Sequence, residues 1–234
     1  MRKQIDMFFN IRKLLANLKK KYFRLESHSQ LAEDRIIEWA LSLMNIEKPS
    51  YLDIGANHPR YLSNTYFFYK KGCRGVCIEP NPLLCKALAK RRRRDVCIQA
   101  GILPGSETEM SFFVMSADTL STFSEQDAES FQRLGYKILE TIKVPIVDIN
   151  KIIQEYFDDR PDFISIDVEG SELEIIKSVD CRPPLWCVET LDFESIEKAE
   201  AVIEHLVSKR YTVFADTFLN TIFVDSDVWN NRKK

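Results

Sequence analysis

Short apolar runs alternate with amphipathic segments along the first half of the chain. Apolar residues with helical spacing predict helices at 33–43, 64–71 and 83–92, and continuous apolar runs predict strands at 51–55, 74–79 and 95–102. Strands that alternate with helices across short connections imply right-handed crossovers, with helices on both faces of a parallel sheet. The hydrophobic pattern therefore predicts an α/β fold.

The pattern changes in the middle of the chain. Residues 116–141 are polar and weakly periodic, which predicts a partly loop-like segment between two candidate partner strands, 110–115 and 142–147. Beyond it, the predicted helices are 148–157, 171–178 and 195–208, and the predicted strands are 162–168, 185–189, 211–215 and 220–224. A tight turn separates the last two strands, so we expect a mostly parallel sheet that finishes in an antiparallel hairpin.

Length and composition are those of a single globular domain. The chain has 234 residues, of which 45% are hydrophobic and 29% charged, and two compact domains would be tight at this length. We expect a basic, helical N-terminal region over 1–48, one folded domain over 49–226 and a tail over 227–234. The net charge of −2 predicts no nucleic-acid partner, and the basic run 91–94 is interpreted as cations at a helix end.

The N-terminal segment is the exception in composition. Residues 1–24 contain eight lysines and arginines against one acid, Asp6, and their apolar residues recur at helical spacing. Such a basic amphipathic helix can lie on an anionic membrane surface, and a lid or packing helix with a solvated basic face is the alternative. The sequence shows no secretory signal and no apolar run long enough to span a bilayer. We therefore expect a cytoplasmic protein whose membrane contact, if it has any, is peripheral.

Two of the predicted strands end in turns that suit a nucleoside. Gly55 follows the first strand and would let the backbone pass close to a ligand, while Glu79 follows the second and would accept hydrogen bonds from ribose hydroxyls. A dinucleotide-binding loop normally needs three glycines for its pyrophosphate, and this turn has only one. A ligand with a ribose and no phosphate is favoured. S-adenosylmethionine fits, with Asp53 and the Gly55 turn facing its amino-acid part.

A second group of acids lies at the end of a later strand. Asp167 and Glu169 share one side of the chain after the predicted strand 162–168. Two carboxylates this close raise one pKa, which suits a general base, or they bind a divalent cation. Glu189 closes the next strand and would be a third acid on the same rim. Glu172 and Glu174 are interpreted as solvated charges on a helix face.

Together these motifs resemble those of the FkbM methyltransferases, which mostly methylate hydroxyls of sugars and related metabolites. The matching segments are Asp53-Ile-Gly-Ala-Asn-His-Pro59, Ser63-Asn-Thr65, Ile78-Glu-Pro-Asn81, Ile166-Asp-Val-Glu-Gly-Ser-Glu172 and Ser29-Gln-Leu-Ala-Glu-Asp34. In the last segment Ala32 stands where the family usually has glycine. The resemblance implies a Rossmann-like class I methyltransferase fold in the domain 49–226 and S-adenosylmethionine as cofactor.

The resemblance also implies a set of site residues. The implied cofactor-binding residues are Asp53, Gly55, Ala56, Asn57, Glu79, Pro80, Asn81, Gln99 or Ala100, and Asp118. The candidate catalytic residues are Asp167 and Glu169, with His58 as a second candidate base because imidazole titrates near neutral pH. A divalent cation, if the enzyme uses one, would be held by Asp167, Glu169 and Glu189.

The acceptor is expected to be a small molecule or a glycan. The alternatives are a methyltransferase that acts on a non-sugar small molecule or a protein, and a catalytically silent nucleoside-binding scaffold. The sequence leaves the oligomeric state open.

Overall fold

The computed structural model describes residues 26–168, 170–192 and 197–232. The predicted basic helix over 1–24 and the candidate catalytic residue Glu169 lie outside these ranges. Of the helices within them, none is long and apolar enough to cross a bilayer.

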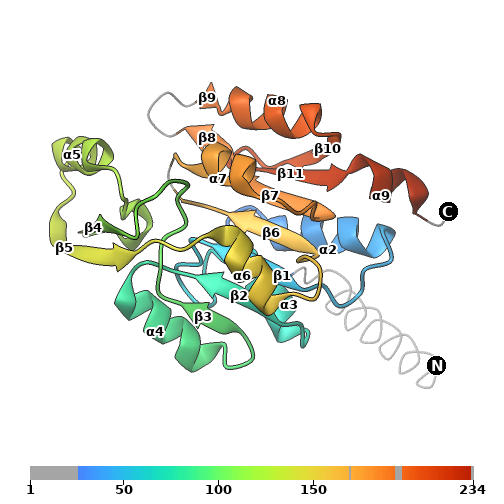
Figure 1. Ribbon diagram of the computed structural model, residues 1–234, viewed down its shortest axis with the longest axis horizontal. Helices are drawn as coiled ribbons and strands as arrows, with labels where there is room; N and C mark the ends of the chain where they lie inside the picture. The colour runs from blue at the N-terminus through green and yellow to red at the C-terminus, as the bar shows by residue number, and fades with distance from the viewer. Residues whose placement is uncertain (1–25, 169, 193–196, 233–234) are drawn as a thin grey trace, which may run out of the picture.

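A central sheet organises the molecule (Figure 1). In the described part of the chain seven strands form this sheet in the order β10-β11-β7-β6-β1-β2-β3. They are β1 (Tyr51–Ile54), β2 (Gly75–Ile78), β3 (Val96–Ile98), β6 (Phe163–Ile166), β7 (Leu185–Glu189), β10 (Tyr211–Asp216) and β11 (Asn220–Asp225). The strands from β7 to β3 run parallel, and β11 is antiparallel to both β7 and β10. The predicted parallel sheet with a C-terminal antiparallel hairpin is therefore confirmed.

Helices cover both faces of this sheet (Figure 1). They are α2 (Glu33–Leu43), α3 (Tyr66–Lys70), α4 (Pro82–Arg91), α6 (Ile149–Tyr156), α7 (Glu172–Ser178), α8 (Glu200–Ser208) and α9 (Ser226–Asn231). Alternation along β1 places Leu52 and Ile54 in one core with α6, α7 and α8. It places Tyr51 in a second core with α2 and α3, and Cys77 of β2 packs with Leu88 of α4. The side chain of Asp53 therefore shares the face of Tyr51.

An arm stands beside the sheet (Figure 1). Its strands β4 (Glu109–Met115) and β5 (Ile138–Pro145) pair antiparallel, as the sequence suggested. The segment between them holds a short 3-10 helix, η1 (Asp118–Leu120), and the helix α5 (Glu125–Arg133). The prediction of a partly loop-like segment missed α5. Ser124 caps that helix by accepting a hydrogen bond from the backbone N–H of Asp127.

The other differences from prediction lie at element ends. The third strand stops at Ile98 because the chain then turns toward the arm, where Gly101 donates to the carbonyl of Pro145. The tail predicted from residue 227 belongs mostly to α9, which Asp225 caps. Two short strands, β8 (Leu191–Asp192) and β9 (Glu197–Lys198), come after β7 and pair with each other.

Candidate active site

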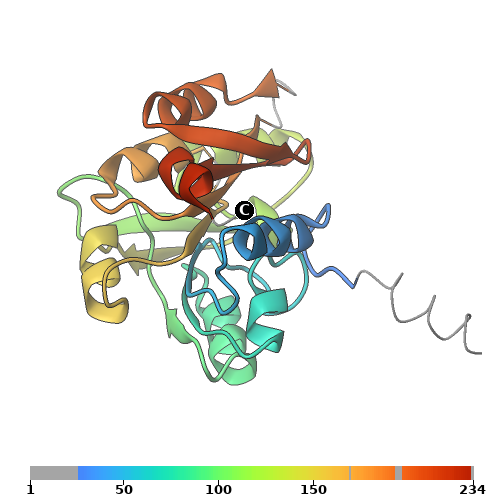
Figure 2. The ribbon, with the colours of Figure 1, turned by 90° about the vertical axis from the view of Figure 1, so that its right-hand side faces the viewer.

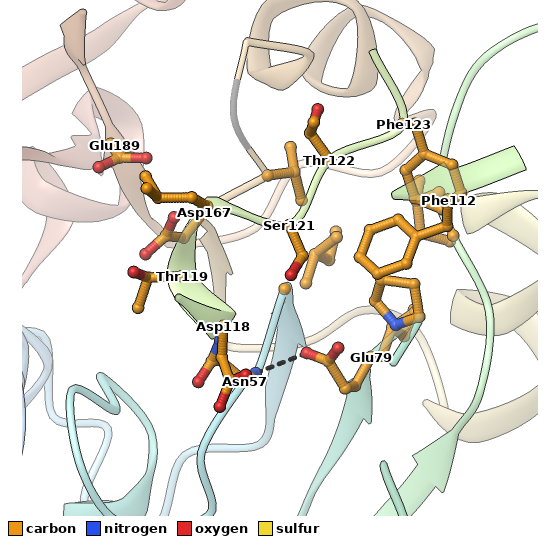
Figure 3. A pocket seen from close by; sticks show the side chains of 18 of the residues that line it. Asn57, Glu79, Phe112, Asp118, Thr119, Ser121, Thr122, Phe123, Asp167 and Glu189 are labelled. Carbon is orange, nitrogen blue, oxygen red and sulfur yellow. Dashed lines mark hydrogen bonds between the residues drawn. The ribbon is translucent and has the colours of Figure 1, made fainter. Parts of the chain in front are cut away.

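A cavity of about 290 Å³ lies where the parallel strands end (Figure 3). Its wall includes Gly55 after β1, Glu79 after β2, Asp167 after β6 and Glu189 at the end of β7. Ligands of open α/β sheets bind outside the carboxyl ends of the strands. The two predicted turns and two of the predicted acids, Asp167 and Glu189, are therefore gathered at the expected edge of the sheet.

Gly55 is required by the packing of two strand ends. Its φ is +80°, and a Cβ atom at this position would lie 1.8 Å from the carbonyl oxygen of Asp167. The N–H of Gly55 donates to the carbonyl of Ile78 on the other side. The sequence predicted close approach of the backbone to a ligand. The structure shows a close approach to the neighbouring strand β6 as well, and this approach brings Asp167 beside the turn.

Glu79 is a buried carboxyl with fixed orientation. It is 4% exposed, and its two oxygens accept hydrogen bonds from the backbone N–H groups of Asn57 and Asn81, each at 2.8 Å. Burial raises the pKa of Glu79 to about 7, although the two amide hydrogen bonds act in the opposite direction. Each carboxylate oxygen keeps a further lone pair, so the group can also accept hydrogen bonds from a pair of ribose hydroxyls.

An aromatic end of the cavity is formed by the arm. The rings of Phe112 and Phe123 lie 4.8 Å apart and line the cavity together with Ile102. Phe123 packs so closely on Gly101 that a Cβ atom there would lie 2.5 Å from the ring. A flat apolar wall of this kind suits a nucleobase. Sequence reasoning missed both rings: Phe112 was only part of the apolar pattern of the strand 110–115, and Phe123 lies in the segment 116–141, which has no clear pattern.

An acidic end lies on the other side of Glu79 (Figure 3). Asp167 and Glu189 both line this end of the cavity. Burial raises the pKa of Asp167, the Glu189 carboxyl acts in the opposite direction, and the nearby Glu33 adds to the rise. Glu33 itself is fully buried in α2. The arrangement is a carboxyl pair in which Asp167 binds a proton more readily than a free aspartate does.

The structure brings only part of the predicted cofactor set together. Gly55, Asn57, Glu79, Pro80, Ala100 and Asp118 line the cavity. Ala56 and Gln99 do not belong to the lining, and Gln99 is exposed. Asn81 caps α4 by accepting a hydrogen bond from Leu83 N–H at 3.0 Å. The Asp53 carboxylate lies outside the lining, where it accepts a hydrogen bond from Thr65 and is 3.6 Å from Arg92.

Two further residues discussed in the sequence analysis accept hydrogen bonds from backbone N–H groups. His58 is exposed, and its Nδ1 accepts hydrogen bonds from the N–H groups of Arg60 at 3.2 Å and Tyr61 at 2.9 Å. Glu172 is only 8% exposed and accepts hydrogen bonds from the N–H groups of Val168 and Gly170. Its interpretation as a solvated helix charge is therefore wrong, because its carboxylate holds the loop after β6.

The metal hypothesis rests on Asp167, Glu169 and Glu189. Within the described ranges the structure contains no group of three or more His, Cys, Asp or Glu residues arranged to hold a metal ion. Glu169 lies outside those ranges.

The topology and the site define a class of protein. The sheet is parallel except for β11, which is inserted between β10 and β7, and a carboxylate after β2 is placed for a ribose. This is the framework of a class I S-adenosylmethionine-dependent methyltransferase. Residues 53–213, more than half of the chain, match the family model of the FkbM methyltransferase domain. The chain belongs to the FkbM methyltransferase family, as its sequence motifs indicated.

Solved structures with a similar overall arrangement share little sequence with this chain. An O-methyltransferase from Bacillus cereus in complex with S-adenosylhomocysteine has 12% identity and a TM-score of 0.42, over 90% of this chain and 88% of that chain. The fibrillarin pre-rRNA processing protein of Methanococcus jannaschii has 13% identity and a TM-score of 0.42, over 76% and 67%. A human methyltransferase 10 domain containing protein has 14% identity and a TM-score of 0.39, over 93% and 95%. No curated protein sequence matches the chain.

The residues present fit S-adenosylmethionine. Glu79 offers a carboxylate to the ribose, the turn of Gly55 and Asn57 borders the space beside the acidic pair, and Phe112 and Phe123 offer a surface for adenine. These residues would hold the cofactor between the aromatic end and the acidic end of the cavity.

Proposed function

We propose that this enzyme methylates a hydroxyl group of a sugar, either free or within a glycan or glycolipid precursor. The observation that carries the proposal is the pair of carboxyl side chains, Asp167 and Glu189, at the end of the cavity opposite the aromatic rings. An alcohol must lose its proton when it is alkylated, and a desolvated carboxylate with a raised pKa is a suitable acceptor for that proton. Gln30 and Thr119 line the same cavity, which supports a polar acceptor.

Each residue of the site has a distinct task in this proposal. S-adenosylmethionine supplies, when bound, an electrophilic methyl group. Asp167 accepts the proton of the acceptor hydroxyl, and Glu189 is a second carboxyl at the same end of the cavity. Glu79 and the turn after β1 align the cofactor, and alignment of the reacting groups is a large part of the rate enhancement. Asp167 lines the cavity and His58 does not, which favours Asp167 over His58 as the base.

The acceptor class is tested by methyl transfer to a panel of nucleotide sugars and glycans. Transfer to a sugar hydroxyl is the expected result. The assay is run with and without a chelator, because the same carboxylates are suitable ligands for a divalent cation. Transfer to non-sugar small molecules or proteins alone would contradict the sugar assignment. Stabilisation by S-adenosylhomocysteine without any turnover would indicate a binding scaffold.

The role of Asp167 is tested by replacing it with asparagine. We expect Asp167→Asn to lower kcat by about 100-fold or more, while the affinity for S-adenosylhomocysteine stays within about twofold. Glu174→Gln is the matched control, because Glu174 is an exposed carboxylate of α7 paired with Lys177 at 2.8 Å. Wild-type turnover in Asp167→Asn would remove Asp167 from the mechanism.

A further inference from the structure

Two cysteines lie side by side on the neighbouring parallel strands β2 and β3. Cys77 and Cys97 are register partners in these strands, and Cys97 packs against the buried cluster that contains Cys77 and Leu88 of α4. Register partners on parallel strands project to the same face and lie about 5 Å apart. This spacing is within the range of Cα separations that a disulfide bond spans. The two sulfurs can therefore be joined within the existing sheet.

The two thiols differ in their access to solvent. Cys77 is 0% exposed, whereas Cys97 is partly exposed. Strand β3, which carries Cys97, forms one edge of the seven-stranded sheet in the described part of the chain. Figure 1 and Figure 2 both show β3 beside α4 at the lower end of the molecule. A small oxidant therefore reaches Cys97 from the edge of the sheet, and Cys77 lies directly behind it.

The surroundings of the pair favour ionisation of Cys97 over that of Cys77. The neighbouring Cys77 thiol lowers the pKa of Cys97, and the buried guanidinium of Arg92 adds to this effect, while burial and two nearby acids, Asp95 and Asp53, oppose it. The neighbouring Cys97 raises the pKa of Cys77, whose sulfur lies 3.8 Å from Asp95 Oδ2. Because the thiolate is the reactive form of cysteine, Cys97 is the thiol that reacts first.

The pair is connected to the cofactor-binding carboxyl of Glu79. Glu79 follows Cys77 by two residues, and its N–H donates to the carbonyl of Ile98, the residue after Cys97, at 3.0 Å. The Cβ atoms of register partners lie about 5 Å apart, like their Cα atoms, whereas a disulfide needs about 3.8 Å. A bond between the two sulfurs would therefore draw β2 and β3 together and shift the Glu79 carboxylate from its place beside Asn57 N–H.

We propose that Cys97 and Cys77 form a reversible disulfide, with hydrogen peroxide as the oxidant, and that this disulfide weakens cofactor binding. The Cys97 thiolate attacks one peroxide oxygen, the O–O bond breaks and hydroxide leaves, so that Cys97 becomes a sulfenic acid. The Cys77 sulfur then attacks the Cys97 sulfur, the S–O bond breaks, and the hydroxyl group leaves as water with the Cys77 proton. In total, two thiols lose two hydrogen atoms and one peroxide is reduced to two water molecules. A dithiol reductant reverses the reaction.

The test treats the full chain with hydrogen peroxide, blocks the remaining thiols with N-ethylmaleimide and maps disulfides by mass spectrometry. We expect one disulfide between Cys77 and Cys97, with the loss of two hydrogen atoms, and its reversal by dithiothreitol. Cys97→Ala and Cys77→Ala should each abolish this disulfide. Cys85→Ala is the matched control, because Cys85 is a buried cysteine of the adjoining helix α4, and the disulfide should persist in it.

The effect on the site is measured by binding of S-adenosylhomocysteine. The oxidised wild type should bind about tenfold more weakly than the reduced protein, because the ribose-binding carboxylate is displaced. Cys97→Ala should bind equally before and after treatment, which separates the disulfide from other oxidation. Thermal unfolding of the reduced variants checks that each one folds.

A peroxide-treated chain without this disulfide overturns the proposal, and so does an oxidised chain that binds S-adenosylhomocysteine as tightly as the reduced one. A disulfide that persists in Cys77→Ala but is lost in Cys85→Ala would join Cys85 to Cys97 and also overturn the proposal. Neither measurement involves the methyl acceptor, so failure here is distinguishable from failure of the proposed function.

Discussion

At the scale of single residues, Glu79 links the burial of one carboxyl to cofactor affinity. Burial raises its pKa to about 7, whereas the ribose hydroxyls of the cofactor need the ionised form as an acceptor. Below that pH the Glu79 carboxyl of the free protein carries a proton, which must leave before the cofactor binds. The affinity for S-adenosylhomocysteine should therefore be constant above about pH 8 and fall as pH drops through about 7, approaching tenfold per pH unit.

Titration calorimetry between about pH 8 and about pH 6 checks this expectation, and it should also detect proton release on binding at the lower pH. Asp118→Asn is the control, since Asp118 lines the cavity and contributes to the raised pKa of Glu79. It should move the transition slightly toward lower pH. An affinity that does not change over this range would show that Glu79 does not bind the cofactor as a carboxylate.

At the scale of elements, the segment before α2 shows how two buried acids shape a loop. Asp34 is fully buried and accepts hydrogen bonds from the Ser27 hydroxyl and the His28 N–H, each at 2.7 Å. The neighbouring Glu33 accepts a hydrogen bond from the backbone N–H of Leu31. The chain enters α2 at these two acids through a left-handed residue, Ala32, with φ of 69°. This is the position at which the sequence departs from the family's usual glycine.

Ala32→Gly should therefore stabilise the protein. Relief of the left-handed strain of an alanine is worth about 1 kcal/mol of unfolding free energy, and urea unfolding measures it. The same substitution in a right-handed helix, Ala89→Gly on the exposed side of α4, should destabilise by about 1 kcal/mol. If both variants lose stability equally, the φ of Ala32 does not limit the stability of the loop.

At the scale of the whole molecule, the sequence predicted the elements that depend on local pattern alone. Both bounds of β7 (Leu185–Glu189) were predicted without error, because a buried parallel strand is a continuous apolar run. Helix α5 was missed because only Ala128 of its residues is buried, so it carries no apolar stripe. The cavity end with Phe112 and Phe123 was missed because it depends on how the arm packs against the sheet.

The most informative departure concerns the basic run 91–94, interpreted from sequence as cations at a helix end. Arg92 lies inside the protein and is 0% exposed. Its guanidinium donates to Asp95 at 2.7 Å and to Thr65 at 2.9 Å, and it lies 3.6 Å from Asp53. Within the sequence of the run, Arg92 looks like its exposed neighbours. Its burial depends on two acids that the fold places beside it, Asp53 of β1 and Asp95, the residue before β3.

This buried network gives the last prediction. Arg92→Met removes the cation that offsets Asp53 and Asp95, so we expect a loss of about 3–5 kcal/mol of unfolding free energy, against less than about 0.5 kcal/mol for the exposed Arg91→Met. Burial raises the pKa of Asp53 and Arg92 lowers it, so the variant's Asp53 should bind a proton at higher pH than in wild type. The loss measured by urea unfolding should therefore shrink as pH falls. A loss independent of pH would mean that Arg92 acts by packing alone.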